Sequence, residues 1–466
     1  MIDNGIEKVL AGNYCIGCGA CAVLDQSAYE IKLDHEGKYQ AERKAVVSED
    51  LSSDLLSSQV CPFADESLNE DELGKQLYGN VDGIKHDAYL GYHLKNYAGF
   101  VSKNSFREKG SSGGMGSWLA STMLREKMVD HVLHVRPSEK SELLFSYAVS
   151  STEDEIIQGA KSKYYPIEMS EILNHVRNTP GKYLLIGVPC FIKAIRLLSL
   201  KEPVFEEKIL YTLGLVCGHL KTDRFAKTIG WQLGIHPDSL QDIDFRVKLP
   251  NKPAGYYGAK VSGEVSSTVV SHTSPMRETI VNNWGHGLFR YNACDYCDDV
   301  LAECADITIG DAWLPEYVSD EGGTNVIIVR NPRIARLLTD FKEELTIEEI
   351  SAEKIYQSQA GGFRHRREGL AYRLFLKDQK NEWHPKKRVE PSDSVSNKRK
   401  KIYHGRIPLL DEGNSAYEKA FEANDFTVFE KYMTPVLNSY NKLYHRSFVI
   451  RIAGKIIRVA RNIITR

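Results

Sequence analysis

Short apolar runs separated by longer amphipathic segments dominate the middle of the chain. These runs are HVLHV (131–135), YLLIGV (183–188), ILYTLGLV (209–216) and NVIIVR (325–330). Each is long enough for one buried strand, and each lies near a segment with helical periodicity. Strands that alternate with helices are typical of an α/β domain with a largely parallel or mixed sheet. We therefore predict such a domain over residues 85–345.

The segments on either side follow other patterns. Residues 28–42, AYEIKLDHEGKYQAE, predict two short strands around a His-Glu-Gly turn, within an N-terminal unit of residues 1–80. Residues 346–466 form a C-terminal extension, of which residues 346–440 are charged and rich in Tyr. We expect these to be mainly helical with loops, including a solvated loop at NKRKK (397–401). The expected fold class is α+β / α/β, with an N-terminal unit, a central α/β domain and a mainly helical C-terminal extension.

The last segment, residues 446–466, carries six Arg or Lys and no acidic residue. On a helical wheel its basic residues gather on one face and its Ile and Val residues on the other. This pattern predicts a basic amphipathic helix that lies peripherally on an anionic membrane surface. The alternative is a terminal helix that docks on its own domain or on a partner protein.

Composition narrows the classes of function. The 466 residues are enough for two or three domains, and 42% hydrophobic with 26% charged residues is typical of a soluble protein. A net charge of −2 argues against nucleic acid as a partner. The chain has no apolar run long enough to span a bilayer, and its start lacks the features of a signal peptide. We therefore expect a cytoplasmic protein, at most peripheral at the inner membrane face.

Cys15, Cys18 and Cys21, followed by Cys61-Pro62, carry the most specific chemistry. Cys-x2-Cys-x2-Cys opens the bacterial ferredoxin run, whose thiolates bind irons of a 4Fe–4S cluster. A second cluster would need cysteines where the chain has Asp25, Leu51, Asp54 and Ser57. We therefore predict a ferredoxin-like 4Fe–4S domain with one cluster, bound by Cys15, Cys18, Cys21 and Cys61. Zinc and structural thiols are the alternatives.

Five further cysteines lie in the central region, at Cys190, Cys217, Cys294, Cys297 and Cys304. Cys217 and Cys190 follow apolar runs, and Cys294 and Cys297 form a chelating Cys-x2-Cys pair. Because the carboxyl ends of parallel strands converge on one crevice, these thiols can meet there. Four of the five predict a second 4Fe–4S cluster, with zinc at Cys294 and Cys297 or buried inert thiols as alternatives.

GSSGGMGSWLASTMLREK (110–127) is a loop of small residues that runs into an apolar helix. Its glycines allow close approach of the backbone to a ligand, and helix N-terminal amides suit a phosphate, to which Ser111 and Ser112 can also donate. A helix cap beside a tight turn is the alternative. Further candidates for contact with phosphate or acidic groups, each otherwise a surface residue, are Lys161, Lys163, Tyr164, Arg246 and Lys248.

These motifs, in this order, resemble the beta-subunit family of the deazaflavin-coenzyme (F420) hydrogenases and dehydrogenases. The resemblance covers roughly residues 1–335 and is carried by SSGGMGSWL, KSKYY, GVPCFIKAI, Cys217-Gly218, and CDYC followed by ADITIGDAW. It implies FAD held by Ser111, Ser112, Gly113, Gly114, Lys163 and Tyr164. It also implies a cluster bound by Cys190, Cys217, Cys294 and Cys297. Cys304 stands where the family usually has an apolar residue, so either Cys190 or Cys304 completes this set.

The expected function is that of an iron–sulfur flavoprotein oxidoreductase. It would pass electrons between 4Fe–4S clusters and FAD, and reduce or oxidise an organic substrate or coenzyme. Its partner would be a one-electron donor such as ferredoxin or a partner subunit. We expect no side-chain nucleophile, and His219, Asp311 and Tyr164 are candidates for supplying a proton. The alternatives are an electron-transfer subunit without its own substrate, or an accessory protein of surface polysaccharide biosynthesis.

Overall fold

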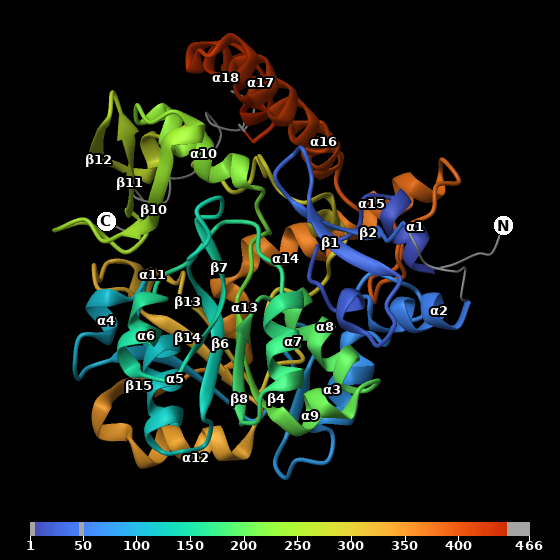
Figure 1. The fold of residues 1–466 in the computed structure, drawn as a ribbon, viewed down its shortest axis with the longest axis vertical. Helices are drawn as coiled ribbons and strands as arrows, with labels where there is room; N and C mark the ends of the chain where they lie inside the picture. The colour runs from blue at the N-terminus through green and yellow to red at the C-terminus, as the bar shows by residue number, and fades with distance from the viewer. Residues whose placement is uncertain (1–4, 46–50, 445–466) are drawn as a thin grey trace, which may run out of the picture.

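The computed structural model describes residues 5–45 and 51–444, and its centre is an eight-stranded mixed sheet (Figure 1). In spatial order the strands are β15 (Leu345–Glu349), β5 (Lys95–Val101), β14 (Asn325–Val329), β13 (Ile307–Asp311), β9 (Ile209–Leu215), β8 (Tyr183–Gly187), β6 (His131–Pro137) and β7 (Phe145–Ser150). The neighbours β13, β9, β8 and β6 run parallel, and the outer strands pair antiparallel. The four predicted strands are β6, β8, β9 and β14, so the mixed α/β sheet is confirmed.

Helices cover both faces of this sheet. Successive residues of a strand point to opposite faces, so each buried strand presents apolar side chains to helices on both sides. In β8, Leu184 belongs to the same apolar core as Trp118 of α5, whereas Leu185 belongs to the core that contains Phe191 of α8. The helices in this part of the chain are α4 (Phe106–Lys109), α5 (Met115–Arg125), α6 (Glu153–Gln158), α7 (Ser170–Asn178), α8 (Pro189–Ser199), α9 (Pro203–Lys208), α11 (Pro315–Val318) and α12 (Pro332–Asp340). Proline at the first position of α8 ends β8 and starts the helix at once, which places Cys190 at a strand end.

The N-terminal part packs against the central sheet. It contains α1 (Gly5–Ala11), β1 (Tyr29–Leu33), β2 (Tyr39–Arg43), α2 (Leu51–Val60), α3 (Glu70–Tyr78) and the short hairpin of β3 (Lys85–Asp87) and β4 (Gly91–His93). β1 and β2 pair antiparallel, which confirms the two predicted strands. Buried residues of this part, such as Tyr14 and Tyr29, belong to the same apolar core as Leu185 and Phe191. The backbone N–H of Met169 also donates to the carbonyl of Cys18 at 3.0 Å.

A smaller antiparallel sheet adjoins the C-terminal helices. It consists of β10 (Leu240–Val247), β11 (Gly258–Val265) and β12 (Thr268–Pro275), next to α10 (Asp223–Gln232). Its apolar residues share one core with those of α16 to α18. The 3₁₀ helices are η1 (Cys21–Val23), η2 (Pro237–Ser239), η3 (Met276–Glu278), η4 (Asn292–Tyr296) and η5 (Lys342–Glu344).

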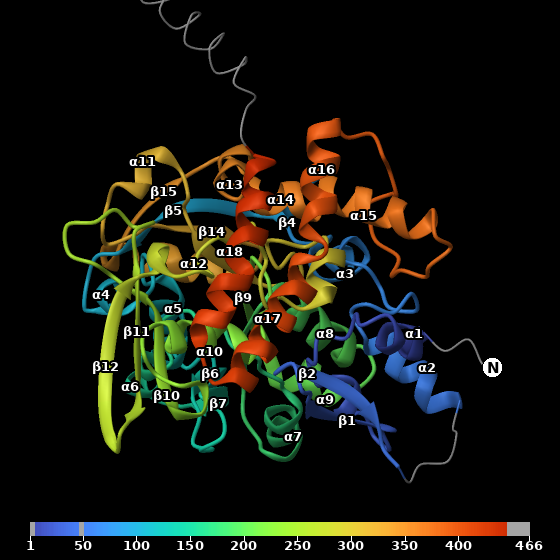
Figure 2. The same ribbon diagram turned by 90° about the horizontal axis from the view of Figure 1, so that it is seen from above.

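The region after the large sheet is helical, as predicted. Its helices are α13 (Ala352–Ser358), α14 (Ala360–Arg366), α15 (Glu368–Asp378), α16 (Asn397–Arg406), α17 (Leu409–Ala423) and α18 (Phe426–Lys442), and Figure 2 shows the last two side by side. The loop expected at NKRKK is wrong, because these residues begin α16. The Ser396 hydroxyl caps that helix by accepting from the N–H of Arg399, and burial of Ile402 and Tyr403 anchors it.

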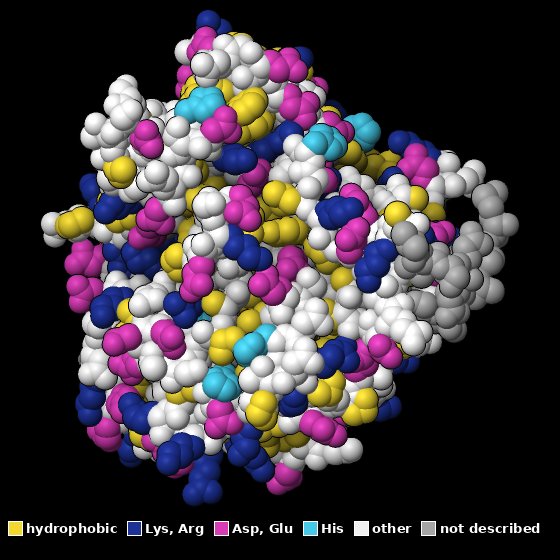
Figure 3. All heavy atoms as spheres, viewed as in Figure 1, with side chains coloured by type: hydrophobic (Ala, Val, Ile, Leu, Met, Phe, Trp, Pro, Cys, Tyr) yellow, Lys and Arg dark blue, Asp and Glu magenta, His cyan; other side chains and the backbone are white. Residues whose placement is uncertain are grey.

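Positive and negative side chains are interspersed over the face of the molecule seen in Figure 3. Among the described residues, no helix has the length and apolarity that crossing a bilayer requires. The predicted amphipathic helix of residues 446–466 lies outside the described residues.

His134 on β6 makes the stability of this fold sensitive to acid. Burial, followed by the charge of Arg136, lowers the pKa of His134 to about 4, and its Nε2 lies 2.8 Å from the Ser150 hydroxyl. An unfolded histidine has a pKa of about 6.5. Between these values the unfolded chain binds the extra proton, so the free energy of unfolding falls as the pH drops below about 6.5.

Between pH 7 and pH 5, we expect the free energy of unfolding of His134→Gln to fall by about 2 kcal/mol less than that of the unaltered protein. Urea denaturation at a series of pH values measures this difference. The matched control is His131→Gln, because His131 lies on the same strand and bonds the Ser151 hydroxyl near solvent. Equal pH profiles for His134→Gln and the unaltered protein would show that His134 is not the source of the acid sensitivity.

Candidate functional site

A cavity of about 1320 Å³ lies at the carboxyl ends of the central parallel strands. Gly187 at the end of β8, Cys217 just after β9 and Asp311 at the end of β13 all line it. This is the edge where ligands bind in open α/β sheets. Typical ligand pockets measure about 300–1,000 Å³, so the cavity has room for more than one organic group.

The Gly-rich loop forms one wall of this cavity. Ser111, Ser112 and Gly114 line it, whereas Gly113 packs behind the loop. A Cβ on Gly113 would come within 2.7 Å of the Gly99 carbonyl, and Gly114 adopts a φ of +80° where it caps α5. The Ser111 hydroxyl accepts from the N–H of Ser162 at 2.9 Å. Glycine is therefore required at both positions to seat the loop on the sheet.

Lys163 and Tyr164 line the cavity beside this loop. The Lys163 ammonium donates to the Ala160 carbonyl at 3.0 Å, and burial lowers its pKa. The Tyr164 ring makes an edge contact with Trp284 at 4.8 Å between centroids, and its hydroxyl accepts from Arg246 at 3.4 Å. Arg246 also forms an ion pair with Asp311 at 2.9 Å, so this carboxylate is already engaged. Five of the six residues predicted to hold the flavin thus face one cavity.

The four cysteines of the N-terminal part converge on one small cavity. Its other walls are mainly apolar and include Ile6, Val9, Leu10, Ile16, Ile31, Ala41 and Val60. Burial raises the pKa of the Cys21 thiol, and the other three thiols of the set raise it further. The Cys15 sulfur accepts from the backbone N–H groups of Gly17 and Ala41, each at 3.4 Å. Gly17 has a φ of +64°, and a Cβ there would lie 2.3 Å from the Tyr39 carbonyl.

A second group of cysteines lies where β8 and β9 end. Burial raises the pKa of Cys190, and its neighbours Cys297, Cys217 and Cys294 raise it further, followed by Cys18 of the first group. Both groups border the same apolar core, to which Cys18, Cys21 and Cys297 belong. Cys217 and Cys294 face the large cavity.

Cys304 lies apart from this second group. Burial and the carboxylates of Glu70 and Asp299 raise the pKa of Cys304, and its backbone carbonyl accepts from the Tyr78 hydroxyl at 2.9 Å. The thiols of Cys217, Cys294 and Cys297 are among the groups that raise the pKa of Cys190, whereas carboxylates and Lys193 surround Cys304.

Arg366 supplies a positive charge to the second group. It is buried at the end of α14, and its guanidinium donates to the Cys217 carbonyl at 3.2 Å and lies 3.9 Å from the Cys217 sulfur. The sequence reasoning missed Arg366. The run RHRRE (364–368) was the available signal, but nothing in its spacing relates it to the cysteines.

Within the described ranges, no group of three or more His, Cys, Asp or Glu side chains could hold a single metal ion. The sulfurs around one zinc ion all lie about 2.3 Å from it. In a 4Fe–4S cube each thiolate binds a different iron, so its four sulfurs do not meet around one metal ion.

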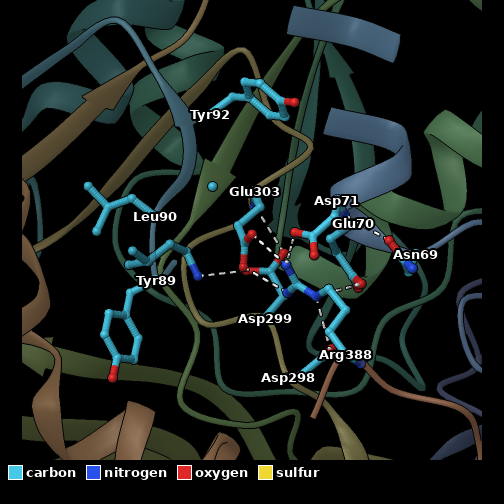
Figure 4. Close-up of polar contacts among 12 residues, drawn as sticks. Asn69, Glu70, Asp71, Tyr89, Leu90, Tyr92, Asp298, Asp299, Glu303 and Arg388 are labelled. Atoms are coloured by element: carbon cyan, nitrogen blue, oxygen red, sulfur yellow. Dashed lines mark hydrogen bonds and ion pairs between the residues drawn. The ribbon is translucent and has the colours of Figure 1, made fainter. Parts of the chain in front are cut away.

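Arg388, from the segment between α15 and α16, fixes the loop that follows Cys297. Figure 4 shows its guanidinium among carboxylates from α3 and from this loop. Its partners are Glu70 at 3.6 Å, Asp71 at 2.8 Å, Asp298 at 3.2 Å and Glu303 at 2.7 Å. The C-terminal extension therefore holds the second cysteine loop and α3 together.

His219, a candidate proton donor, also faces the large cavity. Its ring stacks on Trp284, with 5.1 Å between centroids, and Nε2 lies 3.1 Å from the Arg406 guanidinium. Burial, followed by the charges of Lys221 and Arg406, lowers the pKa of His219 well below its usual range. The ring is therefore neutral near pH 7.

Comparison with known proteins places this site in a family. The description "Coenzyme F420 hydrogenase/dehydrogenase, beta subunit N-term" matches residues 96–174, and the corresponding description of the carboxyl-terminal part of the same beta subunit matches residues 181–354. The two matches cover more than half of the chain. They include the Gly-rich loop and the second group of cysteines, whereas Cys15 to Cys61 and residues 355–466 lie outside them.

Two relatives extend the comparison. An uncharacterized protein of Methanocaldococcus jannaschii is 24% identical over 250 residues, which are 53% of this chain and 84% of the relative. A chain in the xenon-derivatised F420-reducing NiFe hydrogenase complex from Methanosarcina barkeri matches with a TM-score of 0.46 and 16% identity, over 64% of this chain and 96% of that chain. A likeness at this TM-score and identity does not show which residues form the site. On the family matches, the chain belongs to the coenzyme F420 hydrogenase/dehydrogenase beta-subunit family, a family of oxidoreductase subunits.

Proposed function

We propose that the protein is an iron–sulfur flavoprotein oxidoreductase that uses FAD and 4Fe–4S clusters to reduce or oxidise an organic substrate. The observation that carries this proposal is the shared cavity, which brings the Gly-rich loop and the thiols of Cys217 and Cys294 to one space. A flavin exchanges single electrons with clusters and electron pairs with organic substrates, so the two cofactors belong side by side.

The donor chemistry fits a cluster in each cysteine group. Buried thiols that lie close together resist ionisation, as the raised pKa values of Cys21 and Cys190 reflect. Bound iron removes the cost of ionising these buried thiols, because a coordinating thiol is deprotonated outright. Cys15, Cys18, Cys21 and Cys61 would hold one cluster in a ferredoxin-like domain, and Cys190, Cys217, Cys294 and Cys297 would hold the other. Hydrogen bonds to the sulfurs and nearby charges tune the potential of a cluster. Here backbone N–H groups donate to the Cys15 sulfur, and the Arg366 guanidinium lies beside the Cys217 sulfur.

The loop chemistry fits a flavin nucleotide. Ser111, Ser112 and Gly114 present small side chains and backbone beside the N-terminus of α5, where helix amides favour phosphate oxygens. Lys163 has no carboxylate in an ion pair with it among the described residues, so its charge is free for a phosphate. Tyr164 and Trp284 add aromatic surface to the same wall.

Partner subunits or a soluble one-electron donor such as ferredoxin would supply the electrons. The family descriptions are those of a beta subunit, which is consistent with a role as one subunit among several. All nine cysteines are free thiols, and the reducing cytoplasm suits them.

The test of this proposal is anaerobic purification with iron, sulfide and flavin quantified. We expect about eight irons, about eight sulfides and about one FAD per chain. Cys190→Ala should lower the iron content to about four per chain, because it removes a ligand of the second cluster. Cys304→Ala is the matched control and should keep about eight irons. About four irons and no flavin in the unaltered protein would overturn the flavin and second-cluster parts of the proposal. Loss of iron in Cys304→Ala alone would assign the ligand to Cys304.

A second candidate function is a relay subunit without its own substrate. The large cavity exceeds a typical pocket for a single ligand, so it has room for a substrate beside a cofactor. This favours an enzyme with its own substrate over a relay subunit. The discriminating assay uses reduced methyl viologen as donor, with coenzyme F420 and a set of soluble enones and quinones as acceptors. We expect the purified chain alone to oxidise the viologen, above a blank without protein, with at least one acceptor. Activity that appears only after a partner protein is added would establish the relay.

A further inference from the structure

The part of the large cavity nearest the C-terminal extension carries an excess of buried positive charge. Lys221, Arg373 and Arg406 all line it, and each side chain is almost completely buried. One buried carboxylate, that of Asp295, lines the same region. Arg290 lies directly behind this wall and shares that carboxylate.

Asp295 is committed to guanidinium groups. Its two oxygens accept from Arg406 and from Arg290, each at 2.5 Å, and its backbone carbonyl accepts from Arg373 at 2.8 Å. After this pairing the region keeps a surplus of cations. The Nη1 of Arg373 is buried without a hydrogen-bond partner, and so is the Nδ1 of His219.

Lys221 has no carboxylate partner among the described residues. It is 3% exposed, and its ammonium donates to the Leu288 carbonyl at 2.6 Å and lies over the rings of Phe225 and Trp284 at 4.5 and 4.8 Å. Burial, followed by the charges of Arg290 and Arg406, lowers its pKa well below the usual range. Lysines are almost never fully buried unless paired, so this position indicates a missing anionic partner.

The second cysteine group does not by itself balance this surplus. Its sulfur contact with a guanidinium is to Arg366, 3.9 Å from the Cys217 sulfur, and Cys294 is the member of the group that neighbours Lys221. Lys221 and Arg406 instead lie around His219 and Trp284, on the side of the cavity formed by α16.

We propose that Lys221, Arg373 and Arg406 bind the phosphate or carboxylate group of an organic anion, whose apolar part packs on Trp284. Guanidinium groups suit this role because they donate to such oxygens in a fixed fork geometry. Arg373 and Arg406 lie beyond residue 354, outside the family matches, so this region distinguishes the chain from the matched part of the family. The inference rests on the proposed function only in taking the anion to be the redox substrate.

The experiment is calorimetric titration of the purified protein, with its cofactors bound, using sodium pyrophosphate and sodium citrate in separate runs at constant ionic strength. Lys221→Met removes the charge and keeps the length of the side chain. We expect one site per chain for at least one probe, and at least tenfold weaker binding to Lys221→Met. Pyrophosphate alone would indicate a phosphorylated substrate, and citrate alone a carboxylate substrate.

The matched control is Lys419→Met, which removes an exposed lysine of α17 outside the cavity and should bind as tightly as the unaltered protein. If Lys221→Met does not fold, acetylation of the unaltered protein replaces it. The bound probe should then protect Lys221, and not Lys419, from modification as read by mass spectrometry. No binding of either probe, equal binding to Lys221→Met, or no protection of Lys221 would each overturn the proposal. Iron and flavin measured on the same preparation separate this outcome from failure of the proposed function.

Discussion

The guanidinium of Arg366 lies among four cysteines, the half-buried Cys190 and three buried ones, and so joins parts of the chain that are far apart in sequence. Cys190 is the second residue of α8, Cys217 follows β9, Cys294 lies in η4 with Cys297 just after it, and Arg366 ends α14. Thiols packed together away from water need a compensating positive charge before they can act as thiolates. A buried arginine keeps its charge, so Arg366 offers part of that compensation from a fixed position. The strand ends, the cysteine loop and the C-terminal extension are thereby held in one arrangement.

Two buried ionic networks secure the same arrangement. Asp295 binds Arg290 and Arg406, and Arg388 binds carboxylates of α3 and of the loop after Cys297. Breaking a buried pair typically costs about 3–5 kcal/mol, because the remaining charge is left without a partner. Both networks reach from the extension to residues next to Cys294 and Cys297. The extension is therefore a wall of the site rather than an appendage to it.

The sequence predicted the elements whose signals are local. Apolar runs marked β6, β8, β9 and β14, because burial on both faces of a sheet leaves a continuous hydrophobic signature. The Gly-rich loop and the cysteine spacings pointed to the residues that line the two cavities. NKRKK was assigned to a loop because the run itself is charged. The residues that anchor α16 by their burial, Ile402 and Tyr403, come after this run. Arg366, Arg373 and Arg406 could not be predicted, since their roles depend on tertiary neighbours and not on spacing. The sequence left Cys190 and Cys304 as alternatives, and the fold places the two thiols in different surroundings.

The position of the extension at the end of the described chain fixes an order of assembly on the ribosome. Every cysteine precedes Arg366, Arg388 and Arg406 in the sequence. At synthesis rates of about 5–20 residues per second, Cys297 emerges on the order of 5–20 s before Arg406. During that interval the nascent chain has its thiols and its Gly-rich loop but lacks the arginine wall. Until α16 has been synthesised, the chain therefore lacks Arg399 and Arg406, the α16 residues that line the large cavity.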